Sequence, residues 1–372
     1  MSKNIALFSL QTFSTTGGIQ KMTRTLAYAL NAISKKNQSD FKLASLYDSP
    51  HDLMTNYLPA ASFKAFGNRR LSFILKSVSM VKKPGIIILS HINLALVGLI
   101  IKLLRPDCDI WLFAHGIEVW RPLSFLKRML LKKCSKVICV SSYTRQQVLA
   151  WHKVKPEICH VLNNSLDPFL QQPTEFKKPQ YLLERYKLSA GQPVILTLSR
   201  LASTELYKGH DSVIRAVGRL KEEFPDIKYI IAGQCDEEEE LRVRELIAKE
   251  GLTDHVILSG FLDEAELPDH FLLADAFVLP SKKEGFGLVF IEALACGLPV
   301  ICGDSDGSID AIRNGALGSA INADDESELD TCIAGYLRTP LTAERRKSLQ
   351  IECIAHFNTK KYMADLEIMI NG

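Results

Sequence analysis

The sequence predicts an α/β protein with two domains in tandem, each built on a doubly wound parallel sheet. Its 372 residues are enough for about two domains with separate hydrophobic cores. Strand-like and helix-like segments alternate along the chain, as expected for parallel sheets that carry helices on both faces. A polar, proline-flanked segment at residues 173–178 separates two such series and is the expected linker.

The first alternating series fills residues 1–170 and begins with a short apolar run. Strands are predicted at residues 5–10, 41–47, 85–90, 109–114, 136–142 and 158–162, and helices at 17–33, 71–83, 95–104, 121–136 and 145–151. The run at 85–90 is continuously apolar, which is typical of a strand covered on both faces of a parallel sheet.

The second series fills residues 171–357. Strands are predicted at residues 194–199, 228–232, 256–259, 276–280, 300–302 and 318–320, and helices at 209–223, 263–274 and 288–295, with an acidic helix that ends near residue 249. Two helices are expected to close the chain.

The hydropathy and the cysteine content of the sequence bear on the cellular compartment of the protein. No apolar run reaches about 18 residues, so no transmembrane helix is expected, and the apolar run at residues 5–10 is too short for a signal peptide. Nine cysteines are scattered without a C-x-x-C pair, which favours reduced thiols in the cytoplasm over a disulfide framework or a zinc site.

Charge is unevenly distributed along the chain. The net charge is only +3, but residues 1–165 carry 23 lysines and arginines against 7 acidic residues, a balance of +16. The remainder carries 22 against 35, a balance of −13. Such a difference between halves indicates an anionic partner for the first half.

The stretch from 281 to 300 holds the most informative pattern. A glycine-punctuated turn, Glu284–Gly287, follows the strand at 276–280 and opens the helix at 288–295. The free N–H groups of a helix's first turn and the positive end of its dipole favour an anion. Glu284 lies on the turn and Glu292 lies within the helix. We therefore expect them to hold two parts of one long ligand with a diphosphate between, rather than to flank one bond.

Two cations bracket an earlier strand-to-helix loop. Arg200 follows the strand at 194–199, and Lys208 precedes the helix at 209–223. A guanidinium fork and an ammonium point charge together suit a diphosphate.

Two further motifs follow strands of the first series. Gly17 and Gly18 stand between the first strand and its helix, and His115 follows the strand at 109–114. Ligands of open α/β sheets bind outside the carboxyl ends of strands, so both motifs are well placed for binding.

These motifs together resemble the retaining glycosyltransferase family 4. Glu284 and Glu292 match its E-x7-E motif, Arg200 and Lys208 its R-L…K-G pattern, and the Gly-Gly and His-Gly pairs its first-domain loops. The resemblance implies the GT-B fold, with two Rossmann-like domains facing a cleft. Residues 1–170 and a returning C-terminal helix at 358–372 would form the acceptor-side domain, and residues 171–357 the nucleotide-sugar domain.

The resemblance also implies a reaction and roles. A hexose-type sugar would move from a GDP- or UDP-linked donor to a saccharide or lipid-linked acceptor, with retention of configuration. Arg200 and Lys208 would hold the diphosphate, and His115 would lie on the acceptor side. The expected catalytic residues are His115, Arg200, Lys208 and Glu284, and the expected donor-binding residues are Gly17, Gly18, Arg200, Lys208, Leu262, Glu284, Gly285, Phe286, Gly287, Leu288 and Glu292.

Other readings of the sequence stay open. Two D-x-D triplets, at 107–109 and 304–306, could serve a metal-dependent transferase, but the first precedes its strand and the second stands without a wider set of metal ligands. We therefore expect no metal and no cofactor. A nicotinamide-linked enzyme is disfavoured because no G-x-G-x-x-G follows the first strand. A GT-B epimerase or hydrolase acting on UDP-sugars, and a non-catalytic nucleotide-sugar-binding protein, remain alternatives.

The cations of the first half form clusters around apolar residues. One cluster spans residues 69–83 and the other spans 121–133. Cations around an apolar stripe are typical of a helix lying on an anionic membrane, although the stripe could instead pack on the core. No readout motif for nucleic acid accompanies them. We expect a cytoplasmic enzyme, peripheral on the inner face of the membrane, that extends a lipid-linked or envelope polysaccharide precursor.

Overall fold

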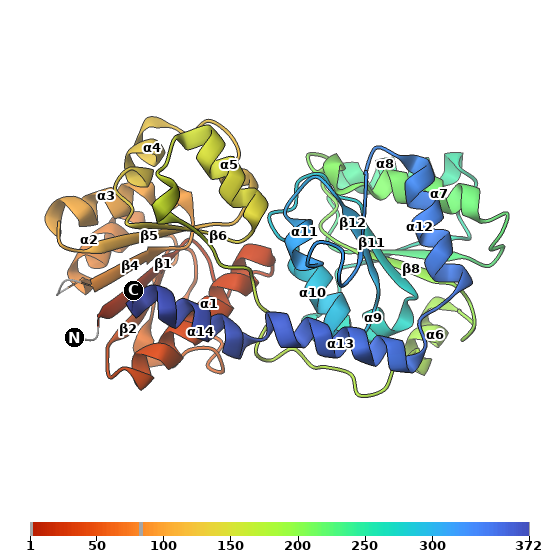
Figure 1. Ribbon diagram of the computed structural model, residues 1–372, viewed down its shortest axis with the longest axis horizontal. Coiled ribbons are helices and arrows are strands. Elements are labelled where there is room, and N and C mark those ends of the chain that lie inside the picture. Colours follow the sequence, from red (N-terminus) through yellow and green to blue (C-terminus); the bar gives the residue numbers. More distant parts are fainter. Residues whose placement is uncertain (1–2, 82–84, 372) are drawn as a thin grey trace. The chain divides into compact units, whose positions relative to one another are not determined.

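The computed structural model describes residues 3–81 and 85–371, which form two compact units (Figure 1). Unit 1 consists of Met1–Pro168 and Phe357–Gly372, and unit 2 consists of Phe169–His356. The boundaries predicted from the sequence are 170/171 and 357/358.

Unit 1 contains a seven-stranded parallel sheet in the order β3-β2-β1-β4-β5-β6-β7. Its strands are β1 (Asn4–Ser9), β2 (Phe41–Ser45), β3 (Phe63–Ala65), β4 (Gly85–Leu89), β5 (Asp109–Ala114), β6 (Lys136–Cys139) and β7 (Cys159–Val161). The sequence did not predict β3, because three partly exposed residues at a sheet edge are too few to show a pattern.

The helices described for unit 1 follow the predicted alternation with one marked difference in length. They are α1 (Gly18–Lys36), α2 (Arg70–Met80), α3 (Ala95–Leu104), α4 (Phe125–Leu131), α5 (Ser142–His152) and α14 (Thr359–Asn371), and α14 packs on α1 (Figure 1). The helix predicted at 121–136 was too long. Pro122 and the extended Ser124 delay its start, and a turn after Leu131 leads into β6. The predicted end of the helix at 71–83 falls partly outside the described residues.

Unit 2 contains a six-stranded parallel sheet in the order β10-β9-β8-β11-β12-β13. Its strands are β8 (Val194–Leu198), β9 (Lys228–Ala232), β10 (Val256–Gly260), β11 (Ala276–Leu279), β12 (Val300–Gly303) and β13 (Ser319–Ile321). The helices described here are α6 (Gln180–Tyr186), α7 (His210–Leu220), α8 (Glu237–Lys249), α9 (Leu267–Leu273), α10 (Leu288–Ala295), α11 (Ser308–Ala311), α12 (Glu326–Arg338) and α13 (Ala343–Phe357).

The end of the chain corrects one expectation. Three helices rather than two follow β13 in the part of the chain that the structure describes, namely α12, α13 and α14. Pro340 separates α12 from α13, since proline lacks the N–H that a continuing helix would need.

The strand order of each sheet determines where a ligand site can form. All strands within a sheet run parallel, so the loops that follow them meet at one edge. The order reverses between β8 and β11 in unit 2 and between β1 and β4 in unit 1. Loops diverge at such a switch point, and ligands of open α/β sheets bind there.

The hydrophobic cores lie between these sheets and their helices. β4 is buried along its whole length, as are β11 and β12. Within the described residues, no helix has both the length and the apolar character needed to cross a bilayer.

Candidate active site

Two loops of unit 2 meet at the switch point between β8 and β11. The loop after β8 ends at Lys208, and the loop after β11 contains Glu284. The main-chain N–H of Lys282 donates to the carbonyl of Tyr207 at 3.0 Å, which fastens the two loops together. Lys208 Nζ forms an ion pair with Glu284 Oε1. The structure thus joins two predicted site residues that are 76 positions apart in the chain.

The Lys208–Glu284 pair is largely shielded from water. Each side chain is only 15% exposed. Burial alone would lower the pKa of Lys208, but the adjacent Glu284 carboxylate outweighs this and raises it above its ordinary value. Lys208 is therefore a positive charge held at neutral pH in a water-poor setting, where electrostatic interactions are strong.

Arg200 is also paired with a carboxylate in this structure. Its guanidinium contacts Glu205 Oε1 within the same loop, and this hydrogen bond raises the pKa of Arg200. The Arg200 side chain is 66% exposed, so a ligand can reach it. An incoming diphosphate would compete with Glu205. Glu205 was not predicted from the sequence, because a glutamate in a loop carries no distinguishing signal.

The aromatic ring of Tyr207 lies close to two ammonium groups, one of which is that of Lys208. Lys208 Nζ is 5.7 Å and Lys283 Nζ is 5.4 Å from the centroid of the Tyr207 ring. Both distances fall in the range of cation–π attraction. Lys283, another residue that the sequence analysis missed, therefore adds positive charge at the same edge of the sheet.

The glycine turn adopts the geometry that its sequence requires. Gly287 precedes α10 with φ of +79°, and a Cβ atom there would lie 2.4 Å from the Phe290 ring. Only glycine fits this position without strain. Phe286 is buried at 2% exposure, so its predicted contact with the donor would come from its main chain, as it would for Gly285. Glu292 lies on α10 and is 5% exposed.

Leu262 lies further from the ion pair in the sheet. It follows β10, an edge strand that is separated from β8 by β9. Its side chain is 7% exposed, whereas the preceding Phe261 is 58% exposed. A base-pocket contact from Leu262 would therefore also be made by its main chain.

In unit 1, Gly17 and Gly18 lie at the start of α1 after the carboxyl end of β1. The loop before them is held by Asp48, a fully buried residue that follows β2. The Asp48 carboxylate accepts N–H groups from Thr12 at 2.8 Å, Phe13 at 3.2 Å and Ser14 at 3.1 Å. Asp48 was not anticipated, because the contact depends on the pairing of β1 with β2.

His115 follows β5, and its ring is already hydrogen-bonded. Its Nε2 lies 2.8 Å from the carbonyl of Ser90, which can only accept, so Nε2 carries the proton. Burial lowers the pKa of His115 to about 4, so the ring is neutral at pH 7. His91, which follows β4, is a neighbour that the sequence analysis missed, and burial lowers its pKa to about 4 as well.

The two D-x-D triplets have other partners. Asp109 opens β5 and accepts from Lys3 Nζ at 2.8 Å. Asp306 accepts two main-chain N–H groups, from Glu284 at 2.6 Å and from Ser308 at 2.9 Å. Across residues 3–81 and 85–371, no three His, Cys, Asp or Glu side chains gather in a way that could hold a metal ion.

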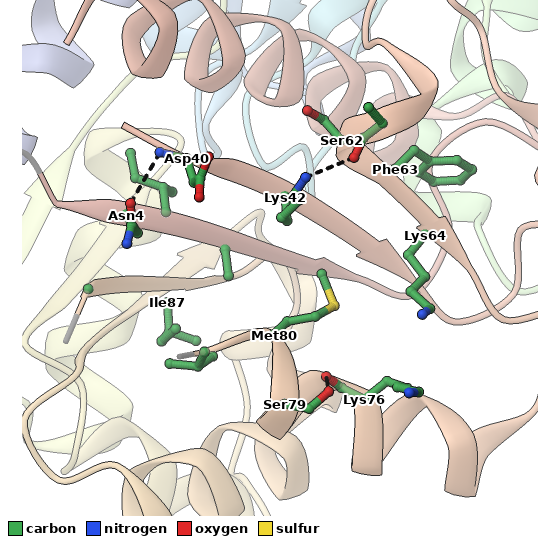
Figure 2. A pocket seen from close by; sticks show the side chains of 15 residues that line it. Asn4, Asp40, Lys42, Ser62, Phe63, Lys64, Lys76, Ser79, Met80 and Ile87 are labelled. Carbon is green, nitrogen blue, oxygen red and sulfur yellow. Dashed lines mark hydrogen bonds between the residues drawn. The ribbon is translucent and has the colours of Figure 1, made fainter. Parts of the chain in front are cut away.

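A cavity of about 420 Å³ lies elsewhere in unit 1 (Figure 2). It is lined at the amino ends of strands, by Asn4 of β1 and Gly85 of β4. Lys64 and Lys76 lie at one end of it and Asp40 at the other. Since Gly17, Gly18 and His115 follow carboxyl ends, this cavity is separate from the predicted site.

Comparison with known protein families identifies the family of this chain. The profile described as "Glycosyl transferases group 1" matches residues 182–351, and that described as "Glycosyltransferase Family 4" matches residues 16–168. The chain belongs to glycosyltransferase family 4. Both sheets, and both sets of loops described above, lie largely within the matched residues.

Similar proteins include two that are named as sugar transferases. A GDP-mannose-dependent alpha-(1-6)-phosphatidylinositol monomannoside mannosyltransferase of Mycolicibacterium smegmatis is 30% identical over 241 residues, which are 62% of this chain and 61% of that protein. An alpha-D-kanosaminyltransferase of Streptomyces kanamyceticus is 27% identical over 220 residues, 59% of this chain and 55% of that protein. The similarity thus spans less than two thirds of either relative.

Solved structures share the fold over nearly the whole chain. HepE of Anabaena, in complex with UDP, superposes with a TM-score of 0.80 at 19% identity and covers 99% of both chains. Sucrose-phosphate synthase of Thermosynechococcus elongatus gives 0.76 at 20% identity, over 99% of this chain and 98% of that one. The predicted fold class, GT-B with two Rossmann-like parallel-sheet domains, is confirmed.

Proposed function

We propose that this family 4 member transfers a hexose-type sugar from a GDP- or UDP-linked donor to a saccharide or lipid-linked acceptor, with retention of configuration. The buried Lys208–Glu284 pair beside the glycine turn of α10 is the observation that carries this proposal. The relative from M. smegmatis is named for GDP-mannose, and HepE binds UDP, so the similarities leave the nucleotide base open.

The chemistry follows from where charge develops. As the bond between the anomeric carbon and the phosphate oxygen breaks, its electron pair moves onto the departing diphosphate. Arg200, Lys208 and the N–H groups at the start of α10 would hold that diphosphate and stabilise the growing charge more than the ground state, which lowers the barrier. Glu284 would bind hydroxyl groups of the donor sugar, and Glu292 those of the ribose.

His115 would act on the acceptor side through its main chain. Because its ring is neutral at pH 7 and Nε2 is hydrogen-bonded to the carbonyl of Ser90, the imidazole is poorly suited to donate a proton. Its carbonyl oxygen could instead stabilise the oxocarbenium-like centre.

The proposal is tested by incubating the protein with GDP-, UDP- and ADP-sugars, with and without acceptors, and measuring released nucleoside diphosphate. A transferase releases it in proportion to acceptor, whereas an epimerase or hydrolase releases it without acceptor. A binding protein releases none. A thermal-shift panel would select the donor first, because a ligand at 100 times its Kd stabilises the folded state by about 2.7 kcal/mol.

We also propose that transfer needs no metal ion. Arg200 and Lys208 supply positive charge for the diphosphate, and the Asp306 oxygens are engaged with main-chain N–H groups. Full activity is expected in excess EDTA. Loss of activity that Mn²⁺ or Mg²⁺ restores would contradict this proposal.

Glu292→Ala is expected mainly to raise the KM for the donor, with little change in kcat. Contacts to the ribose hold the ground state and the transition state alike, so their loss weakens both equally. Steady-state kinetics with varied donor would measure this. A fall in kcat at unchanged KM would show that Glu292 acts on the reacting centre instead.

The acceptor is proposed to reach the enzyme at an anionic membrane on its cytoplasmic side. Helices α2, α3 and α4, which pack side by side, expose large apolar side chains that a core-packing stripe would bury. Leu71 is 79% exposed, Leu103 81% and Phe125 67%. We call this set the apolar face of α2–α4; it comprises Leu71, Leu75, Leu96, Leu103, Leu104, Phe125, Leu126 and Met129.

Vesicle co-sedimentation would test this membrane proposal. Binding is expected to require anionic lipid and to weaken in 0.5 M salt, because each cation near the surface contributes about 1 kcal/mol that salt screens. Substituting serine at Lys127, Arg128, Lys132 and Lys133 should release the protein. Serine at Lys153 and Lys155, exposed cations that follow α5 in the same unit, serves as the control. Equal binding to neutral vesicles, or none to anionic ones, would refute the proposal.

A further inference from the structure

The loop after β12 forms hydrogen bonds with the main chain of Glu284, which lies on the loop after the neighbouring strand β11. Asp306 on this loop is 2% exposed, and its Oδ2 accepts the N–H of Glu284 at 2.6 Å. The next residue, Gly307, donates its own N–H to the carbonyl of Glu284 at 2.8 Å. Both hydrogen-bonding groups of the Glu284 main chain are therefore fixed by two consecutive residues.

Close packing of the two loops accompanies these hydrogen bonds. A Cβ atom on Gly307 would lie 2.1 Å from the carbonyl oxygen of Gly285, so only glycine allows the loop to approach so near. The strands β11 and β12, which precede the two loops, are paired neighbours in the sheet. The contact is thus supported by the rigid part of unit 2.

We propose that Asp306 is a positioning residue for the transfer reaction, which holds the main chain of Glu284 and thereby places the Glu284 carboxylate beside Lys208. This inference rests on the proposed role of Glu284 in the donor site. It gives the second D-x-D triplet a function that involves no metal.

A carboxylate suits this position better than its amide. Asp306 Oδ1 accepts the N–H of Ser308 at 2.9 Å, two residues further on, while Oδ2 accepts from Glu284. An asparagine keeps the local turn to Ser308, because asparagine forms the same side-chain turn. Its NH₂ group would then face the N–H of Glu284, and two donors cannot bond. Asp306→Asn therefore removes the link to Glu284 selectively.

The link also depends on pH. Burial, together with the nearby Glu284 carboxylate, raises the pKa of Asp306 to about 6, although the hydrogen bonds from the Glu284 N–H and from Ser308 oppose the shift. The other ionisable groups nearby are Asp304 on the same loop, Lys208 through its pair with Glu284, and Cys302, a thiol that burial keeps neutral.

Activity and stability should respond to acid in opposite directions. Because the folded-state pKa lies above the ordinary value of 3.8, proton uptake below about pH 6 favours the folded state. The protonated Asp306 can no longer accept both N–H groups. Activity should therefore fall on the acid side of pH 6 while the contribution of this group to stability rises, so the loss is not due to unfolding.

The experiment compares Asp306→Asn with Asp304→Asn, a control in the same triplet whose exposed carboxylate accepts from the Ser305 hydroxyl. Hydrogen exchange of residues 282–287 should speed up in Asp306→Asn only. A fall in kcat of about tenfold or more is expected, since small misplacements of catalytic groups have effects of this order. The acid limb near pH 6 should disappear from the kcat profile of Asp306→Asn.

Combining Asp306→Asn with Glu284→Ala shows whether the effect passes through Glu284. The double variant should be no less active than Glu284→Ala alone. The proposal would be overturned if the two substitutions lowered kcat multiplicatively in the double variant. It would also be overturned if hydrogen exchange of residues 282–287 were unchanged in Asp306→Asn, or if that exchange were faster while kcat stayed normal. If the wild-type protein transfers no sugar, the proposed function fails. The hydrogen-exchange measurement would still test whether Asp306 holds the main chain of Glu284.

A measurement on the wild-type protein covers the case in which Asp306→Asn does not fold. The amide resonance of Glu284 in a ¹H–¹⁵N spectrum should shift with a midpoint near pH 6, because its acceptor titrates there. A resonance that does not move anywhere between pH 3 and pH 8 would refute the proposed link.

Discussion

Glu284→Ala is expected to lower kcat by about two orders of magnitude or more with the fold intact, since one preorganised group that acts in the transition state contributes roughly 3–4 kcal/mol. The structure sharpens the expectation, because Glu284 pairs with Lys208 and its main chain is fixed at both N–H and carbonyl. The measurement is the steady-state transfer rate at saturating donor.

Two further variants serve as comparisons for Glu284→Ala. Glu284→Gln keeps the size and the acceptor oxygen of the side chain but removes its charge, so it separates hydrogen bonding to sugar hydroxyls from the pairing with Lys208. Glu245→Ala removes an exposed carboxylate of α8 in the same unit and should leave kcat unchanged. Retention of near wild-type kcat in Glu284→Ala would mean that the E-x7-E motif does not act in catalysis here.

Lys208→Ala is expected to lower kcat by a similar factor, about two orders of magnitude, because it removes a cation that stabilises charge on the leaving diphosphate. It should also destabilise unit 2. Removing one partner of a buried ion pair costs about 3–5 kcal/mol, and the lower end applies here because both side chains retain 15% exposure. Urea unfolding alongside kinetics would measure both effects.

The double variant Lys208→Ala with Glu284→Ala distinguishes the two effects. Removing both charges leaves no unpaired buried charge, so stability should recover relative to Lys208→Ala alone. Activity should not recover, because both groups act on the donor. Recovery of kcat in the double variant would show that Lys208 serves only to neutralise Glu284.

The sequence by itself determined most of the local structure. The bounds of β5, α3, β9 and α10 agree with the predicted ranges, because a glycine, proline or charged residue stands at or next to at least one end of each apolar run. It failed where such limits were weak, as at the short edge strand β3. It also failed at α4, whose basic flanks resemble helix, although the chain is extended at Ser124 before it and forms a turn after Leu131.

The sequence also pointed to the residues of the candidate site, but not to their partners. Arg200, Lys208, Glu284 and Glu292 stand in local patterns that a strand followed by a glycine turn makes meaningful. Glu205 and Tyr207 have no such pattern, and the D-x-D triplet that contains Asp306 gave no sign of its contact with Glu284. Their importance depends on what lies opposite them, and a local sequence pattern carries no information about that.

Only the tertiary structure decided the pairings and the exposed surfaces. Lys208 pairs with Glu284, and Asp306 accepts the main-chain N–H of Glu284. These residues meet because adjacent parallel strands end at one edge of the sheet, although the crossover connections between the strands place the residues far apart in the chain. The exposure of the apolar face of α2–α4 was likewise undecided by periodicity. An apolar stripe looks the same in sequence whether a core covers it or it faces outward, and only the packing of the neighbouring helices settles which.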